Sequence, residues 1–225
     1  MKQLNKLATA IIPNDGGELV LLQREDEFTI KLSGARGVLM NSRVYNSEQE
    51  LSKLGCAHIK NKENAAVLVG GLGMGYTLAT ALQCVTASST VTVAELIPEV
   101  VEWNRGPLGE CAGRPLDDER SHVLLGDIVD LIKQQKPDFD AILLDVDNGP
   151  ECITKNDNNW IYSSAGLSAL YNSLRPKGML AVWSAAPDSQ FITQLKKAGF
   201  KASDKMVRAR PGKGSRHIIF LAKKP

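Results

Sequence analysis

Short apolar runs alternate with amphipathic stretches over most of the chain. The apolar runs predict buried strands at 65–70, 90–95, 121–126, 139–145 and 178–184. Apolar residues at helical spacing predict helices near 75–86, 98–104, 128–135, 163–174 and 188–198. This alternation is typical of a doubly wound α/β fold, in which helices cover both faces of a mostly parallel sheet. Near the end of the chain, strand-like segments 205–210 and 217–222 flank a Pro-Gly turn, which predicts a closing antiparallel β-hairpin.

The first 60 residues follow a different pattern. Strand-like segments at 18–22, 28–32 and 38–40 predict a small β region. Ser47 and Glu50 have the spacing of a capping box, which predicts a short helix from Ser47 to Ala57. Residues 60–64 are polar and resemble a linker. We therefore expect a small N-terminal β region with a linking helix over 1–60, and a larger domain over 61–225.

The strand predicted at 65–70 ends in a glycine-rich turn formed by Gly70, Gly71, Gly73 and Gly75. Glycine lets the backbone approach a ligand closely, and the helix that follows offers free N–H groups. A dinucleotide fingerprint, G-x-G-x-x-G, would place its third glycine at Tyr76. The observed spacing therefore indicates a nucleotide-type cofactor other than NAD.

Two acidic residues end the next two predicted strands. Glu95 lies about 20 residues beyond the glycine turn, where an acid would accept the ribose hydroxyls. Asp127 follows the strand at 121–126, where an acid suits the adenine amino group. A glycine turn followed by these two acids is the layout of transferases that use S-adenosylmethionine (SAM). We therefore expect a Rossmann-like sheet of the SAM-methyltransferase type that binds SAM.

Polar groups also gather after the strand at 139–145, where Asp145, Asp147 and Asn148 follow one another closely. Ligands of such sheets lie beyond the carboxyl ends of the strands. A carboxylate there can bind an amine and accept its proton, so we expect Asp145 and Asp147 to be catalytic and Asn148 to contact the acceptor. The alternative is that both aspartates only cap the following loop.

Three aromatic residues are further candidates for the acceptor wall. Trp160 and Tyr162 belong to a polar loop, and Trp183 lies near the end of the strand at 178–184. Ordinary packing is an equally good interpretation of Trp160 and Tyr162.

Composition excludes several classes of protein. The net charge of +2 gives no general attraction to nucleic acid or to a membrane surface. No apolar run is long enough for a membrane span, and the four cysteines form no CxxC pair, so we expect reduced thiols and a cytoplasmic location. No histidine is paired at ligand spacing, and we expect no metal site. The basic residues between 201 and 216 suit the solvated face of an edge hairpin, with RNA contact as the alternative.

With these features the chain resembles the spermidine synthase-like family of SAM-fold transferases. The resemblance covers nearly the whole chain and is carried by Asp26-Glu27-Phe28, the turn at 70–75, Glu95, Gly126-Asp127 and Asp145-Val146-Asp147-Asn148-Gly149-Pro150. It implies that Glu95 holds the ribose, Asp127 the adenine and Asp145 the reacting amine.

Two residues depart from the family pattern. Spermidine synthases carry an aspartate inside the glycine turn, where it holds the amine of decarboxylated SAM, and here that position is Gly73. They also carry D-x-x-D-P after the fourth strand, where Asn148 stands here. The first change makes intact SAM acceptable, and the second weakens the acidic cage for a polyamine.

We therefore expect a transferase that acts on a small amine acceptor. Methyl transfer from SAM is favoured over aminopropyl transfer from decarboxylated SAM, which is the alternative. The pattern is also compatible with a non-catalytic SAM-binding protein and with an RNA methyltransferase. The sequence leaves the oligomeric state open, a homodimer included.

Overall fold

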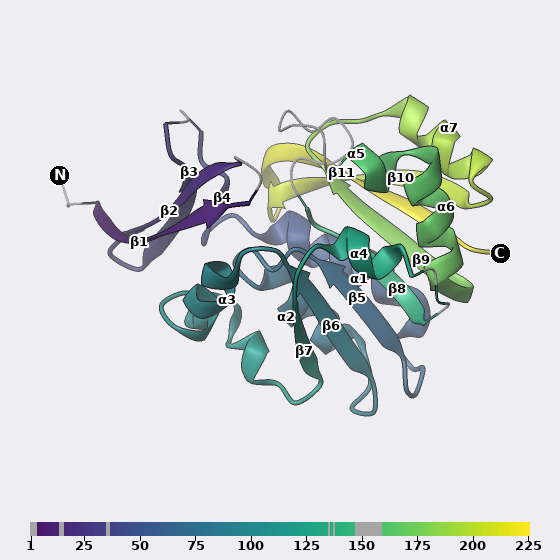
Figure 1. Ribbon diagram of the computed structural model, residues 1–225, viewed down its shortest axis with the longest axis horizontal. Coiled ribbons are helices and arrows are strands. Elements are labelled where there is room, and N and C mark those ends of the chain that lie inside the picture. The colour runs from purple at the N-terminus through teal and green to yellow at the C-terminus, as the bar shows by residue number, and fades with distance from the viewer. Residues whose placement is uncertain (1–3, 14–15, 35–36, 135, 137, 147–158) are drawn as a thin grey trace.

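The computed structural model describes residues 4–13, 16–34, 37–134, 136, 138–146 and 159–225. Its N-terminal part is an antiparallel sheet with the strand order β1-β2-β3-β4 (Figure 1). The strands are β1 (Asn5–Ile12), β2 (Gly17–Arg24), β3 (Glu27–Leu32) and β4 (Met40–Asn41). Leu21 and Ile30 are fully buried, whereas Ile11 on the edge strand is exposed. One face of this sheet therefore faces the core, as is common for antiparallel sheets.

The second sheet has seven strands in the order β10-β11-β9-β8-β5-β6-β7. They are β5 (Ala66–Gly70), β6 (Thr90–Glu95), β7 (Ser121–Leu125), β8 (Phe139–Leu144), β9 (Leu174–Ser184), β10 (Lys201–Arg210) and β11 (Lys213–Lys223). The pairs among β5 to β9 are parallel, and the β10–β11 hairpin joins β9 in antiparallel orientation. The predicted fold class is confirmed.

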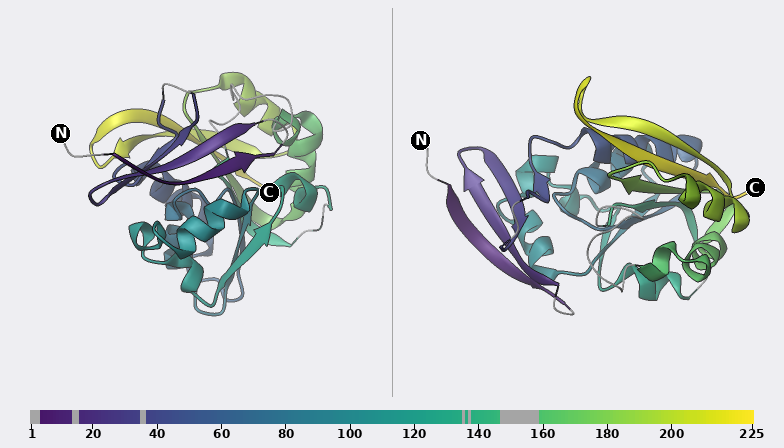
Figure 2. Two further views of the ribbon diagram at one scale, coloured as in Figure 1. Left: turned by 60° about the vertical axis from the view of Figure 1, so that its left-hand side comes forward. Right: turned by 90° about the horizontal axis from the view of Figure 1, so that it is seen from above.

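Helices cover both faces of this sheet (Figures 1 and 2). One layer contains α1 (Asn46–Cys56), α2 (Tyr76–Cys84) and α3 (Pro98–Arg105), and the other contains α4 (Ile128–Ile132), α5 (Asn159–Tyr162), α6 (Ser164–Ser173) and α7 (Ser189–Lys197). Side chains alternate between the two cores along each strand, so Val67 and Val69 join the first core and Leu68 the second. Short 3-10 helices lie at Ala57–Ile59, Gly109–Ala112 and Pro115–Asp117.

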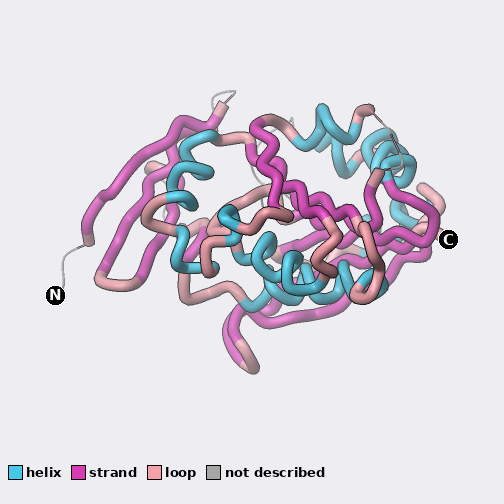
Figure 3. The backbone as a smooth tube through the Cα atoms, turned by 90° about the horizontal axis from the view of Figure 1, so that it is seen from below, coloured by secondary structure: helices cyan, strands magenta, loops and turns pink. Residues whose placement is uncertain are grey.

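The N-terminal sheet lies at one end of the molecule and the C-terminus at the other (Figure 3). None of the helices in the described part of the chain has the length and apolar character that a membrane crossing needs.

The start of α1 corrects one expectation. The helix begins at Asn46 and has no side-chain cap, and Ser47 Oγ donates to Glu48 Oε2 instead of capping the backbone. The predicted capping box is therefore not formed. The helix packs against α2 and the larger sheet. The division of the chain after residue 60 stays a prediction.

Candidate active site

The glycine turn lies at the point where the order of the parallel strands reverses. β5 continues to β6 on one side, and β8 pairs with β5 on the other. Such a switch point is the usual ligand site in open α/β sheets. Gly71 has a φ of +87°, and a Cβ there would lie 2.6 Å from the carbonyl oxygen of Asp145. The backbones after β5 and β8 are thus in close contact, which only glycine at position 71 permits.

The other glycines of the turn have different neighbours. A Cβ at Gly70 would lie 2.5 Å from Ile128 Cδ1, so Gly70 is required by packing. Gly73 and Gly75 have φ values of +53° and +83°. The two other side chains of the turn, Leu72 and Met74, are buried, so the glycines present bare backbone at the carboxyl edge of β5, which suits close approach of a ligand.

Glu95 is fixed beside this turn at the end of β6. Its Oε2 accepts a hydrogen bond from Leu72 N and its Oε1 accepts one from Ile97 N, each at 2.9 Å. Burial raises the pKa of the Glu95 carboxyl, although the backbone N–H donors oppose the rise. The backbone N–H groups of Leu96 and Gly73 also favour the ionised form of this carboxyl. Contact of Glu95 with ribose hydroxyls stays a prediction.

Asp127 and two exposed leucines lie at the same edge, Leu96 directly after β6 and Leu125 at the end of β7. Asp127 caps α4, because its Oδ1 accepts a 2.8 Å hydrogen bond from Val129 N. Leu125 is paired in register with Glu95 and is 58% exposed, and Leu96 is 42% exposed. Exposed apolar side chains next to two carboxyl groups fit an adenosine, whose base is flat and whose hydroxyls need acceptors. These residues therefore fit the adenosyl group of SAM or decarboxylated SAM.

Asn104 is a positioning residue that the sequence did not reveal. It lies on α3 and is 2% exposed. Its Nδ2 donates to the carbonyl oxygen of Gly73 at 2.8 Å and to that of Val100 at 2.9 Å. The amide thus fixes the middle of the glycine turn. A single asparagine within a helix carries no signal of this contact in the sequence.

Asp145 follows β8 and approaches the turn from the acceptor side. Its backbone N donates to Gly70 O at 2.9 Å, and its Oδ2 accepts a 2.5 Å hydrogen bond from Thr77 Oγ1. Burial raises the pKa of the carboxyl to about 6, although the Thr77 hydroxyl opposes the rise. Asp145 is therefore a half-buried carboxyl group held by a neutral hydroxyl.

The other end of β8 shows how a structural carboxylate differs. Asp140 accepts hydrogen bonds from Lys62 Nζ at 2.5 Å and from Arg175 at 2.8 Å. Burial would raise the pKa of Asp140, but Lys62, the Ala66 N–H and Arg175 together hold it below its usual range. Among the described residues, no lysine or arginine forms an ion pair with Asp145. Asp140 is neutralised by two cations, whereas the partner of Asp145 is a neutral hydroxyl, and this difference favours a functional role for Asp145.

Glu48 is a second carboxyl group of this region that sequence reasoning missed. It lies in the first turn of α1, and burial together with the charge of Asp145 raises its pKa to about 7. Acidic residues are common in first turns because they interact with the helix dipole. The sequence therefore gave no reason to single it out.

The proposed acceptor residues are only partly described. Asp147 and Asn148 lie outside the described residues. Trp183 packs edge-on against His217 with 4.7 Å between ring centroids, and neither Trp183 Nε1 nor His217 Nδ1, both buried, has a hydrogen-bond partner among the described residues. This aromatic pair offers two polar atoms near the end of β9. Contact of Trp183 with an acceptor stays a prediction.

Trp160 and Tyr162 lie on α5, where we expected a loop. Lys133 Nζ lies 5.3 Å from the ring centroid of Trp160. Tyr162 is 7% exposed and packs edge-on against Phe191. Packing, the alternative interpretation, thus accounts for the environment of Tyr162. Contact of either residue with an acceptor stays a prediction.

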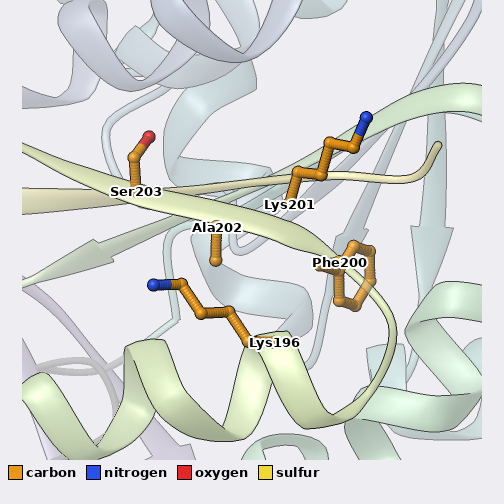
Figure 4. A pocket seen from close by; sticks show the side chains of 5 residues that line it. All are labelled: Lys196, Phe200, Lys201, Ala202 and Ser203. Atoms are coloured by element: carbon orange, nitrogen blue, oxygen red, sulfur yellow. The ribbon is translucent and has the colours of Figure 1, made fainter.

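A separate hollow lies between α7 and β10 (Figure 4). It has a volume of 480 Å³ and is lined by Lys196, Phe200, Lys201, Ala202 and Ser203. Within the described part of the chain, none of the residues predicted for cofactor or acceptor binding lines it. Lys201 belongs to the basic stretch between residues 201 and 216, which suits a solvated edge hairpin, and Lys196 lies on α7 beside it.

Solved structures share this fold. A spermidine synthase in complex with the transition-state analogue AdoDATO matches with a TM-score of 0.76 and 16% identity, covering 100% of this chain and 74% of that one. The spermidine synthase of Thermotoga maritima matches with a TM-score of 0.77 and 16% identity, covering 100% and 75%. At this identity the likeness concerns the fold.

Sequence relatives are similar over more than half of the chain. A polyamine aminopropyltransferase of Sulfolobus acidocaldarius is 26% identical over 135 residues, which is 60% of this chain and 43% of that protein. One of Prochlorococcus marinus (strain AS9601) is 28% identical over 134 residues, covering 58% and 44%. The matched region thus spans less than half the length of these relatives. Residues 46–207 match the spermine/spermidine synthase domain, and this chain therefore belongs to that family.

Proposed function

We propose that the protein transfers an aminopropyl group from decarboxylated SAM to the nitrogen of a small amine. The observation that carries the proposal is Asp145, a carboxyl group with a raised pKa and a hydroxyl partner, packed against the glycine turn. Membership of the family and the activity named for its relatives support the same transfer. They give no support to methyl transfer, which the sequence had favoured.

The chemistry follows from the arrangement of the site. With the ribose on Glu95, the donor sulfur lies over the glycine turn, and Asp145 approaches from the other side. The amine nitrogen forms a bond to the carbon next to the sulfonium, the C–S bond breaks, and its electron pair stays on sulfur. Asp145 binds the amine and accepts its proton. Positioning and exclusion of water supply the rest of the acceleration.

Methyl transfer from intact SAM is a second candidate, favoured by one observation. Gly73 brings no charge to the turn, and the side chain nearest to it is the neutral thioether of Met40. A donor that keeps its carboxylate meets no repulsion there.

A cytoplasmic location and a homodimer stay predictions as well.

A product assay tests the proposal. The protein is incubated with 1,4-diaminobutane and either donor, and the amine product is identified by mass spectrometry. An aminopropylated amine is expected from decarboxylated SAM, and a methylated amine from SAM would support the second candidate. Thermal shifts with each donor and with methylthioadenosine report binding, since a ligand at 100 times its Kd stabilises by about 2.7 kcal/mol. Binding without any transfer would contradict both activities and favour a non-catalytic SAM-binding protein.

A further inference from the structure

We propose that Glu48 contacts the acceptor nitrogen together with Asp145 and is the second carboxyl group of the acceptor site. The proposal rests on the function proposed above and names a residue for the step at the acceptor nitrogen. Helix α1 would thus supply a carboxyl group to the acceptor site, in addition to the aspartates that follow β8.

A chain of contacts directs this face of α1 toward Asp145. Glu48 and Ser52 are four residues apart and lie one above the other on the helix. Ser52 Oγ donates to the carbonyl oxygen of Thr77 at 2.7 Å. Thr77 Oγ1 in turn donates to Asp145 Oδ2 at 2.5 Å. The face of α1 that carries Glu48 therefore lies against the start of α2, next to the Asp145 carboxyl.

The immediate partners of Glu48 leave it able to bind a cation. Ser47 Oγ donates to its Oε2 at 2.7 Å. Within the described ranges, no lysine or arginine forms an ion pair with Glu48 or Asp145. Burial raises the cost of ionising both carboxyl groups, and the charge of Asp145 adds to that cost at Glu48. An ammonium group placed between them would offset that cost, which identifies the ligand as a cationic amine.

Two carboxyl groups also match the proton balance of the reaction. The acceptor enters as an ammonium ion and must lose one proton before its nitrogen can attack. After the N–C bond has formed and the C–S bond has broken, the product is again an ammonium ion and the sulfur is a neutral thioether. One proton is therefore released per turnover. With two carboxyl groups, one holds the nitrogen while the other takes this proton.

The same helix offers a matched control. Glu50 lies two residues after Glu48, and its Oε1 is 3.0 Å from Lys53 Nζ in an ion pair. Glu48→Gln and Glu50→Gln remove the same charge from neighbouring positions of one helix. Glu48→Asp keeps the carboxyl group on a shorter side chain and tests rescue.

The experiment measures kcat and KM for 1,4-diaminobutane at a saturating donor concentration. Calorimetry with 1,4-diaminobutane in the presence of methylthioadenosine gives a readout that needs no turnover. Loss of a charge-assisted hydrogen bond predicts that Glu48→Gln weakens amine binding about tenfold or more and lowers kcat. Glu50→Gln should stay within about twofold of the wild type, and Glu48→Asp should recover part of the loss. Methylthioadenosine affinity should be the same in all four proteins.

Three results would overturn the inference. Glu48→Gln with wild-type KM, kcat and amine affinity would remove Glu48 from the site while leaving the proposed function standing. Equal losses of amine and methylthioadenosine affinity would assign Glu48 a purely structural role. A wild type that neither binds the amine nor yields a product from either donor would contradict the inference and the proposed function together.

Discussion

The thioether of Met40 lies against Gly73 in the glycine turn. A Cβ at Gly73 would come 3.1 Å from Met40 Sδ and 3.6 Å from its Cε. Met40 belongs to β4, so the N-terminal sheet supplies a wall of the turn. Where the family pattern has an aspartate, this chain therefore has no side chain, and its nearest neighbour is a neutral thioether.

Introducing the missing charge should change the choice of donor. Gly73→Asp places a carboxylate near the donor tail, and aspartate tolerates the positive φ of +53° better than most residues. Like charges about 4 Å apart cost on the order of 4 kcal/mol at an effective dielectric constant near 20. The ratio of affinities for decarboxylated SAM and SAM, measured by calorimetry, should therefore rise at least tenfold. Gly73→Asn is the neutral control of similar size.

Met40 should limit this switch, because its flexible end must move to admit a side chain at position 73. Met40→Ala combined with Gly73→Asp should therefore show a larger preference for decarboxylated SAM than Gly73→Asp alone. Met206→Ala, which truncates an exposed methionine on β10, is the matched control. An affinity ratio that none of these variants changes would mean that the donor tail lies elsewhere.

Asp145→Asn should abolish transfer while sparing the donor. An amide cannot accept the acceptor's proton, and loss of a general base typically costs about 10²- to 10⁴-fold in rate. The Thr77 hydroxyl can still donate to the amide oxygen, so the turn should keep its shape. The check is kcat with 1,4-diaminobutane together with methylthioadenosine affinity. Activity within a few-fold of the wild type would show that the proton goes to another group.

The sequence predicts those parts of the fold whose residues form a recognisable pattern within a short stretch of chain. Buried strands such as β5 and β8 are continuous apolar runs, and the glycine turn follows directly from β5. Glu95 is the last residue of β6 and Asp127 caps α4, so strand order alone brings both to one edge. Periodicity and parallel topology are therefore sufficient for this half of the site.

The remaining contacts depend on how distant segments pack. The charge of Asp145 acts on Glu48 only because α1 lies on the larger sheet, and Met40 lies against Gly73 only through the placement of β4. Ser47 had the spacing of a capping box, but its hydroxyl bonds to its neighbour's carboxylate. β1 and α5 were likewise missed, since β1 is an edge strand in which only Ala10 is buried and α5 is a single turn. Such contacts between distant segments leave no periodic signal.

Glu95 should support the fold as well as the donor. A residue that only bound the ribose could be truncated without harm to the fold, but the Glu95 carboxylate also holds the N–H groups of Leu72 and Ile97. A buried donor without a partner costs about 1–3 kcal/mol. Glu95→Ala should therefore lower the free energy of unfolding in urea by about that amount or more, besides weakening methylthioadenosine binding. Glu95→Gln keeps part of the acceptor capacity and should be less destabilised. Wild-type stability of Glu95→Ala would mean that water replaces the carboxylate.

The pH dependence of stability should reveal the carboxyl pair even without a substrate. In the folded protein the pKa of Glu48 is raised from 4.5 to about 7 and that of Asp145 from 3.8 to about 6. Between pH 4 and 7 the folded state therefore binds more protons than the unfolded state, and the free energy of unfolding falls as the pH rises. The stabilisation is fully present below the unfolded pKa values and is lost as the pH passes through 6 and 7.

Glu48→Gln should flatten this dependence. Between pH 5 and pH 8 the variant should lose about 1–2 kcal/mol less stability than the wild type, a value reduced for the partial exposure of Glu48. Burial lowers the pKa of His58 and of His217. These histidines make the free energy of unfolding rise with pH, but they do so equally in the wild type and in Glu48→Gln. Urea unfolding at the two pH values measures the difference, and Glu50→Gln should keep the wild-type slope. If Glu48→Gln also kept that slope, the pKa of Glu48 would not be raised in the folded protein, and the charge of Asp145 would not act on it.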